Sequence, residues 1–494
     1  MQRFGVWGVL AAVCLASAFH LRGLAQTPGG GIAASFGVPR AVDPAAVNQR
    51  IFVCGILTEP LWLPTQDSDS GRFPLGVFWD DGLRFESAND QFHLHLGGTI
   101  QVDSTWLIGP TSVFALPGGG ANGIGNASAT FLRRARIRAD GDIFGLFDFV
   151  IEYDLANASN ENSGDQPPSF SNLTSSPSPA NVWMQIRDVP VLDYVRFGYQ
   201  TKPIGMTNNT SQADLPFLER PDVNDAIYAP FDGGYALGIS AHDWTESERM
   251  TWRYGIYRPG TNVFGVALNK YAYGARVTGL PLYENEGRSL IHLGFGFWGG
   301  QVVQDDLRLR ARPVLRNGPG FAVPVLVDTD QIPGTRQYTL GPEFALVRGP
   351  LTIQAEWTGQ FLTNAVANNE AQGTAFFHGG YVEALWFLTG EFQDYNKRDG
   401  VFGRVVPLHD YYLHRGESSF SLGAWQMGVR FSYLNLNDKA VQGGQIYDWT
   451  FGLNWFLNAN MKFQFNYIVE RRESPPASST GWINGIGVRG AFNF

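Results

Sequence analysis

Apolar and polar side chains alternate strictly along many short segments of this chain. In residues 462–467 the aromatic rings share one face and the polar groups share the other, and residues 149–154 and 195–200 repeat the pattern. The last ten residues continue it up to Phe494. A period of two is typical of a β-strand with one apolar and one polar face. The pattern therefore predicts an all-β protein.

The apolar faces of these strands could form the core of a soluble sandwich or the lipid-facing surface of a membrane barrel. Two features favour the barrel. The chain ends on an aromatic residue inside its last strand, which resembles the signal read by outer-membrane assembly machinery. The connections also alternate between short and long, as periplasmic turns and external loops do. We therefore expect a transmembrane β-barrel whose outer face contacts membrane lipids.

The pattern predicts sixteen antiparallel strands, an even number, as single-chain bacterial barrels require. They are expected near 90–107, 130–140, 146–156, 181–187, 193–200, 235–242, 250–258, 270–279, 288–300, 336–346, 351–362, 379–388, 422–434, 447–457, 461–470 and 483–494. Long external connections are expected at 108–129, 157–180, 201–234, 259–269, 301–335, 363–378, 435–446 and 471–482. One long connection, 389–421, falls on the side of the short turns.

The first 25 residues are typical of a signal peptide. Arg3 precedes an apolar run, and small residues come before Gln26. A buried N-terminal helix is the alternative. Cys14 lies inside this segment, so Cys54 would remain as a single thiol with no disulfide. Residues 26–81 are rich in proline and show no clear alternation, and we expect them to form a periplasmic extension of unknown role, with the barrel at 82–494.

Composition agrees with this organisation and narrows the function. Charged residues make up only 16% of the 494 residues, against about a quarter in soluble domains. A net charge of -9 argues against a nucleic-acid-binding protein. A sixteen-stranded barrel is too wide for its own side chains to fill, so its default activity is passive diffusion of small hydrophilic solutes.

Two other classes stay open at this point: a plugged structural or adhesive barrel, and an outer-membrane hydrolase. The histidine pair His93 and His95, and His409 with His414, lack a third ligand at suitable spacing. The chain also has no Gly-x-Ser-x-Gly elbow. We therefore expect neither a metal, nor a cofactor, nor enzymatic activity.

Two groups of arginines are candidates for an ion pathway. Alternate residues of a strand lie about 7 Å apart on one face. Arginines so placed repel one another unless water or anions surround them, and a guanidinium grips a phosphate or carboxylate in bidentate fashion. The first group lies in the 301–335 connection, which we place at the outer mouth: Arg308, Arg310, Arg312 and Arg316. Pairing with Asp305 and Asp306, or contact with lipopolysaccharide phosphates, would be the alternatives.

The second group consists of Arg133, Arg134, Arg136 and Arg138. Alternation puts the last three on one face. A charge facing lipid at mid-membrane costs about 2–4 kcal/mol, so this face must point to the lumen or lie near an interface. A salt-bridge network with Glu152 and Asp154 on the next strand is the alternative to a role in the pathway.

From about Gly82 to Phe494 the chain resembles the phosphate-selective porin O and P family. The similarity is carried by stretches spread in order along the barrel: Phe131 to Ala135, Glu152 to Leu155, Val195 to Gly198, Ile204 to Met206, Phe217 to Arg220, Gln354 to Trp357, Phe387 to Glu391 and Leu453 to Trp455. The resemblance implies a trimeric sixteen-stranded outer-membrane porin whose third loop folds into the lumen.

The resemblance also implies roles for particular residues. In the family an arginine ladder leads anions into the pore, and the first arginine group has the spacing of that ladder, so we call this group the arginine ladder. The family pair that matches Arg133 and Arg134 lines the constriction. Lys202, Ser211 and Arg220 lie in the third loop. The chain departs from the family at its central anion site. Asn208 matches the lysine of that site, and Asn181 matches the acidic partner of that lysine. We therefore expect a porin that prefers anions and lacks the family's central lysine.

Overall fold

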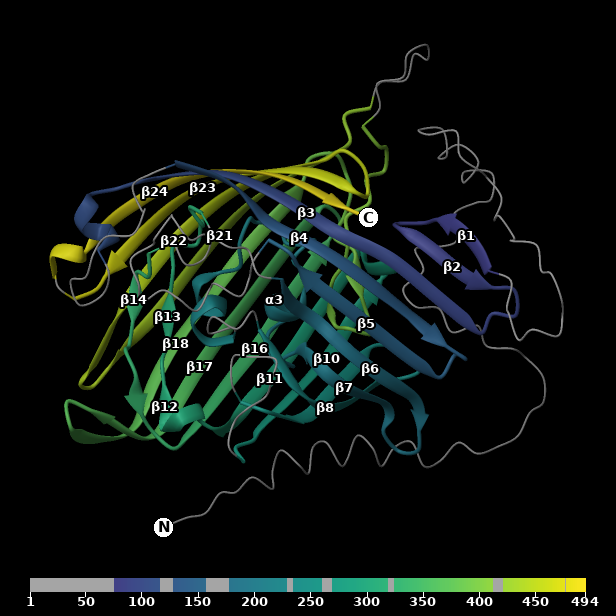
Figure 1. Ribbon diagram of the computed structural model, residues 1–494. Helices are drawn as coiled ribbons and strands as arrows, with labels where there is room; N and C mark the ends of the chain where they lie inside the picture. The colour runs from purple at the N-terminus through teal and green to yellow at the C-terminus, as the bar shows by residue number, and fades with distance from the viewer. Residues whose placement is uncertain are drawn as a thin grey trace.

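The computed structural model describes residues 75–115, 128–156, 177–228, 234–259, 269–318, 324–411, 421–475 and 477–494. The expected signal peptide, most of the expected extension and both cysteines lie outside these residues, so those expectations stay predictions. The described chain forms a closed antiparallel barrel of sixteen strands, as the alternation predicts (Figure 1).

Each barrel strand pairs with its neighbours in sequence order. The strands are β3 (Phe92–Ile108), β4 (Ser128–Ile143), β5 (Phe147–Asp154), β6 (Ser178–Val189), β7 (Asp193–Thr201), β8 (Tyr235–Trp244), β9 (Met250–Tyr257), β10 (Ala272–Glu284), β11 (Ser289–Gln301), β16 (Arg336–Arg348), β17 (Leu351–Ala367), β18 (Glu370–Phe387), β21 (Ala424–Asp438), β22 (Val441–Phe456), β23 (Met461–Glu473) and β24 (Gly481–Asn493).

The last strand closes the barrel against the first. β24 pairs with β3 from Asn484 opposite Ile108 to Asn493 opposite Thr99. The backbones of Gly98 and Phe494 then exchange two hydrogen bonds of 2.6 and 3.0 Å. Beside this seam a hairpin of β1 (Leu75–Trp79) and β2 (Leu83–Ser87) pairs with the start of β3. The aromatic chain end is therefore built into the sheet.

Alternation sorts the side chains to the two faces as predicted. On β23 and β24 the outward Phe465 and Trp482 are 40% and 50% exposed, while the inward Gln464 and Arg489 are 1% and 0% exposed. An apolar surface that is exposed all round the barrel belongs in lipid, so the alternative of a soluble sandwich is wrong. In the parts of the chain that the structure describes, no helix is both long and apolar enough to cross a membrane.

Two of the expected long external connections are wrong. β17 and β18 meet in a turn at residues 368–369, and β21 and β22 meet at residues 439–440, so the strands run through the expected loops 363–378 and 435–446. The extra strand length has a partner inside the barrel. Leu362, Phe377 and Leu434 are 0–1% exposed because they pack against an inserted connection.

That inserted connection is the segment between β11 and β16. It forms two small hairpins, β12 (Asp306–Leu307) with β15 (Ile332–Pro333) and β13 (Arg310–Ala311) with β14 (Val327–Asp328). Its apolar side chains join one buried cluster with inward residues of the wall: Leu309, Ala311, Leu315, Leu326 and Val327 from the connection, and Leu362, Leu434, Ile446, Ile468 and Ile483 from the strands. The connection thus lines the inner wall, as Figure 1 shows for β13 and β14, instead of standing at the outer mouth as expected.

The described part of the long connection on the short-turn side also folds inward, which the sequence did not predict. Between β18 and β21 it carries a hairpin of β19 (Tyr395–Asn396) and β20 (Val401–Phe402). This periplasmic hairpin packs its apolar side chains with Met206, Leu280 and Leu290 inside the barrel. Segments from both ends therefore enter the lumen.

Candidate functional site

The described part of the connection between β7 and β8, residues 202–228, folds into the lumen and narrows it, as the family resemblance implied. It carries α3 (Met206–Asn209) and η5 (Asn224–Tyr228), and we call it the constriction loop. Glu356 of β17 anchors it by accepting hydrogen bonds from the backbone N–H groups of Met206 and Thr207, at 3.0 and 2.7 Å. The sharp entry into α3 requires glycine: Gly205 has a φ of 74°, and a Cβ there would lie 2.5 Å from the ring of Tyr228.

Glu219 of the constriction loop holds the loop to the wall. Its carboxylate lies 2.6 Å from Arg133 Nε, 3.3 Å from Arg134 Nη2 and 3.1 Å from Arg489 Nη2. Burial alone would raise the pKa of Glu219, but these arginines hold it well below its usual range. Arg489 also binds Asp103 through Nε at 2.6 Å. Three arginines of two strands, β4 and β24, thus meet one loop carboxylate.

Arg133 reaches Glu219 only because the strand is irregular. Simple alternation would direct Arg133 away from Arg134, but β4 bulges against β3: Gln101 pairs with Arg134 and Val102 pairs with Leu132. The extra residue turns both arginines toward the lumen. The bulge was not visible in the sequence pattern.

The rest of the second arginine group binds carboxylates of the wall. Arg136 lies 3.3 Å from Glu152 and 3.1 Å from Asp154, and Arg138 lies 2.7 Å from Asp140. The salt-bridge network that the sequence left open is therefore present for Arg136. Arg138 keeps 39% of its side chain exposed and faces the lumen.

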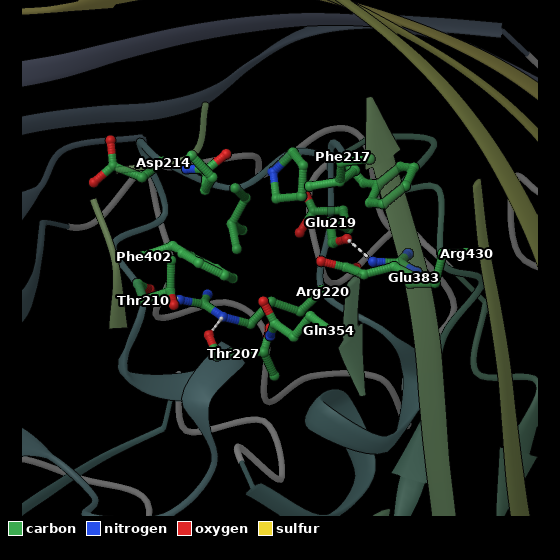
Figure 2. Close-up of a pocket in the computed structure, with 14 residues that line it drawn as sticks. Thr207, Thr210, Asp214, Phe217, Glu219, Arg220, Gln354, Glu383, Phe402 and Arg430 are labelled. Atoms are coloured by element: carbon green, nitrogen blue, oxygen red, sulfur yellow. Dashed lines mark hydrogen bonds between the residues drawn. The ribbon is translucent and has the colours of Figure 1, made fainter. Parts of the chain in front are cut away.

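Arg220 faces a small cavity between the constriction loop, β17, β18, β21 and the periplasmic hairpin (Figure 2). Its Nε donates to the carbonyl of Thr207 at 2.7 Å and its Nη2 to the carbonyl of Thr210 at 2.6 Å. Across the cavity Arg430 donates to the carbonyl of Glu219 at 3.0 Å. The cavity measures about 20 Å³, little more than a water molecule needs. The loop therefore packs closely against this side of the wall.

The three other predicted residues of the constriction loop, Lys202, Asn208 and Ser211, differ in their exposure to the lumen. Lys202 is buried, donates to the carbonyl of Tyr228 at 3.3 Å and lies over the Trp298 ring at 5.4 Å. Asn208 is 5% exposed and donates to the carbonyl of Lys202 at 3.3 Å. Ser211 is exposed and accepts from the N–H of Ala213 at 3.2 Å. Asn208 thus stabilises the loop fold and does not present its amide to the passage.

The arginine ladder binds carboxylates that the sequence did not suggest. Arg308 lies 2.6 Å from Asp328 on the neighbouring strand of the insert. Arg312 and Arg316 lie 2.8 and 3.1 Å from Asp225 of the constriction loop. Burial would raise the pKa of Asp225, but the two arginines lower it to about 2.

The carboxylates that were expected as ladder partners lie elsewhere. Asp305 lies 2.7 Å from Lys270 instead. Arg310 is half-buried at the start of β13. The arginine ladder therefore joins the connection between β11 and β16 to the constriction loop, through Arg312 and Arg316.

Several functional candidates were missed in the sequence, among them Asp225, Glu356, Arg430 and Arg489. Arg489 could have been found, since it lies on the polar face of the final strand. The others depend on contacts between loops and distant strands, which no local pattern indicates.

The comparisons with known proteins agree with this geometry. The family model described as phosphate-selective porin O and P matches residues 114–480. The chain belongs to the phosphate-selective porin O and P family. An uncharacterised protein of Caulobacter vibrioides is 25% identical over 409 residues, which cover 80% of this porin and 71% of that relative.

Solved structures with a similar fold include the outer-membrane channel DcaP of Acinetobacter baumannii. It is 10% identical, with 83% of this porin and 99% of that chain covered and a TM-score of 0.48. OmpT of Vibrio cholerae, in its trimer form, is 9% identical, with 82% and 100% covered and a TM-score of 0.48.

The family assignment makes the protein an outer-membrane channel for small solutes. Two of the histidines considered for metal binding are in ion pairs: His93 lies 2.8 Å from Asp90 and His95 lies 3.1 Å from Asp140. Within the described ranges no group of three or more histidine, cysteine or acidic residues is arranged to hold a metal ion. His414 lies outside those ranges.

Proposed function

We propose that this porin is a homotrimer that lets small hydrophilic solutes diffuse passively across the outer membrane and that it prefers anions. Diffusion through a pore needs no reaction, cofactor or nucleotide. The preference is set by the charges that water reaches in the constriction, because buried charges are already paired and desolvated.

One observation carries the anion preference: the lumenal charges that remain partly exposed are mostly arginines. Arg133, Arg136, Arg138, Arg196, Arg220 and Arg253 are all partly exposed. Ten carboxylates that the wall points inward are instead buried: Asp103, Asp142, Asp148, Glu152, Asp154, Glu343, Glu356, Glu383, Asp448 and Glu470. Asp140 and Asp214 are partly exposed, and Asp394 and Asp399 of the periplasmic connection are exposed. These four carboxylates leave the exposed set positive against the six arginines. The net charge of -9 does not oppose this, since charges on the rims are screened within about 8 Å at physiological salt.

The preference that we propose is for anions in general and not for phosphate alone. Asn208 takes the place of the family lysine and is buried in the loop, so it offers no point charge to a phosphate. Single-channel recording with chloride, phosphate and pyrophosphate in turn tests this. We expect stepwise openings in all three salts, with no deep block of chloride current by phosphate. A barrel plugged for structural or adhesive roles would give no stepwise openings.

Neutralising Arg220 tests the proposed preference at one residue. Arg220 binds only backbone carbonyls among the described residues, so Arg220→Gln removes an exposed positive charge without leaving a carboxylate unpaired. The reversal potential in a potassium chloride gradient should shift toward the cation side by a clear fraction of the wild-type value. Arg471→Gln is the matched control, because Arg471 lies on the outer face and binds Glu473. A reversal potential unchanged by Arg220→Gln would exclude Arg220 from the ion pathway.

Neutralising the ladder should have a smaller effect on selectivity. Arg308 is balanced by Asp328, so Arg308→Gln with Arg310→Gln is expected to lower the chloride preference less than Arg220→Gln does. Adding Arg312→Gln should also loosen the two inserted segments, since Arg312 is 2% exposed and binds Asp225. The measurements are reversal potential and current noise of the open channel. If the double variant has the wild-type reversal potential, the ladder has no part in guiding anions.

A further inference from the structure

Three aromatic rings form a stack on the inner wall near the periplasmic end of β7 and β8. Tyr194 stacks on His242 at 5.3 Å and on Trp244 at 4.8 Å between ring centroids. All three point inward, because Phe197 and Ile239 on the same strands are the exposed outward residues. The rings are partly exposed. A water-filled lumen gives no reason to expose apolar rings, so this stack calls for a ligand.

Two arginines border the stack without a carboxylate partner. Arg196 donates to Gln185 Oε1 at 3.0 Å and its guanidinium lies 3.8 Å from the centre of the Trp183 ring. Arg253 donates to Gln200 Oε1 at 2.6 Å and to the carbonyl of Thr201 at 2.9 Å. In the part of the chain that the structure describes, neither arginine lies in an ion pair.

Two buried nitrogens of this wall have no hydrogen-bond partner among the described residues: Arg253 Nε and His242 Nδ1. His242 and Arg253 are directly opposite each other on β8 and β9, so both nitrogens belong to the same place on the wall. The Arg253 nitrogen can only donate, and a buried donor without an acceptor costs free energy. This place is therefore built for an acceptor that the chain does not supply.

We propose that the inner wall of β7, β8 and β9 is a binding subsite for small aromatic carboxylates on their way through the pore. The solute's carboxylate oxygens accept hydrogen bonds from the guanidinium groups of Arg253 and Arg196, which donate in the fork geometry that suits a carboxylate. The ring of the solute packs on Tyr194 and Trp244, since aromatic rings prefer offset stacking at centroid distances of about 4.5–7 Å. The subsite rests on the proposed anion channel and names the class of solute that it favours.

The chemistry of the wall favours this solute over a sugar or inorganic phosphate. A sugar needs acceptors as well as donors, but three nearby carboxylates are engaged. Asp148 binds Arg187, Asp399 accepts from Asn396 at 2.6 Å, and Glu248 binds Lys397 at 2.6 Å and Arg398 at 2.7 Å. Phosphate would use the arginines but has no ring to pack on Tyr194 and Trp244. Arg398 of the periplasmic connection lies 4.8 Å from the Trp244 ring centre and borders the subsite on the periplasmic side.

Block of chloride current in planar bilayers tests the subsite, with benzoate as the probe and acetate as the comparison. Benzoate should block the wild-type channel at a clearly lower concentration than acetate. Arg253→Gln and Trp244→Ala should each raise the half-blocking benzoate concentration about tenfold, which corresponds to ~1.4 kcal/mol. Trp252→Ala, on the outer face of β9, is the matched control, and benzoate should block it at the same concentration as the wild type. Arg196→Gln serves as a second charge variant if Trp244→Ala fails to assemble.

The outcomes separate this inference from the proposed function. Equal block by benzoate and acetate in the wild type would overturn the subsite, while the chloride reversal potential independently reports whether the channel prefers anions. A loss of benzoate block in Trp252→Ala as large as in Trp244→Ala would also overturn it. Strong block by glucose in place of benzoate would reassign the wall to sugars and equally overturn the proposal.

Discussion

Replacing residues 392–403 of the periplasmic connection with a short glycine–serine linker is expected to raise single-channel conductance several-fold. These residues carry the periplasmic hairpin, which reaches from β18 past β17 and β16 to β11 and β10 inside the lumen. Arg276 of β10 donates to the carbonyls of Asp399 and Gly400 at 2.9 and 2.7 Å. His292 of β11 lies 2.6 Å from the hydroxyl of Tyr395. A segment held inside the lumen against β10 and β11 reduces the open cross-section, and its removal should widen the periplasmic end.

The increase should come from the cross-section and not from a change in selectivity. Phe402 lines the small cavity beside Arg220, so removal of the hairpin opens that cavity toward the periplasm. Conductance in symmetric potassium chloride measures the first effect and the reversal potential measures the second. The matched control is Glu248→Gln, which breaks the ion pairs to Lys397 and Arg398 and leaves the hairpin in place.

The control should conduct like the wild type, because partly exposed ion pairs of this kind contribute only about 0–1 kcal/mol. If the shortened protein conducts like the wild type too, the hairpin does not limit the pore and the constriction loop alone sets the conductance.

The strands and the closure of the barrel could be predicted because they depend on local alternation. A period of two repeats within each strand, and it continues through the last one. The expected first strand at 90–107 is β3 at Phe92–Ile108, and the last is β24, which pairs with it. The two loops that were wrong, 363–378 and 435–446, contain inward residues whose apolar partners lie in another connection. No pattern within those segments shows that they have a partner.

The site could be predicted in part for the same reason. The inner face of Arg134, Arg136 and Arg138 followed from alternation. The partners of the arginines did not: Arg312 binds Asp225, which is 87 positions away, and Arg489 binds Asp103, which is 386 positions away. Such contacts exist only once two loops have folded into the lumen, and the free energy of that insertion comes from buried side chains such as Leu309 and Leu315. Short apolar runs inside a loop carry no periodicity from which this could be inferred.

Removing the charge of Glu219 is expected to have the largest effect on the constriction. In Glu219→Gln the guanidinium groups of Arg133, Arg134 and Arg489 lose their shared carboxylate, and Arg489 keeps only Asp103. Breaking a buried ion pair from one side costs about 3–5 kcal/mol, because the other charge stays buried and uncompensated. The loop should move away from β4 and β24 so that water reaches these arginines.

Two measurements should change together in Glu219→Gln. The reversal potential should shift further toward chloride, and conductance should rise, since positive charge is exposed where the loop retracts. The temperature at which the barrel unfolds should fall, because the loop bridges β4 and β24 through this carboxylate. Glu473→Gln is the matched control: Glu473 binds Arg471 at 2.6 Å with 39% of its side chain exposed, and such a pair contributes only about 0–1 kcal/mol. Wild-type selectivity and unfolding temperature in Glu219→Gln would show that the loop is held by its other anchors, above all Glu356, and that the arginines around Glu219 do not set the preference for anions.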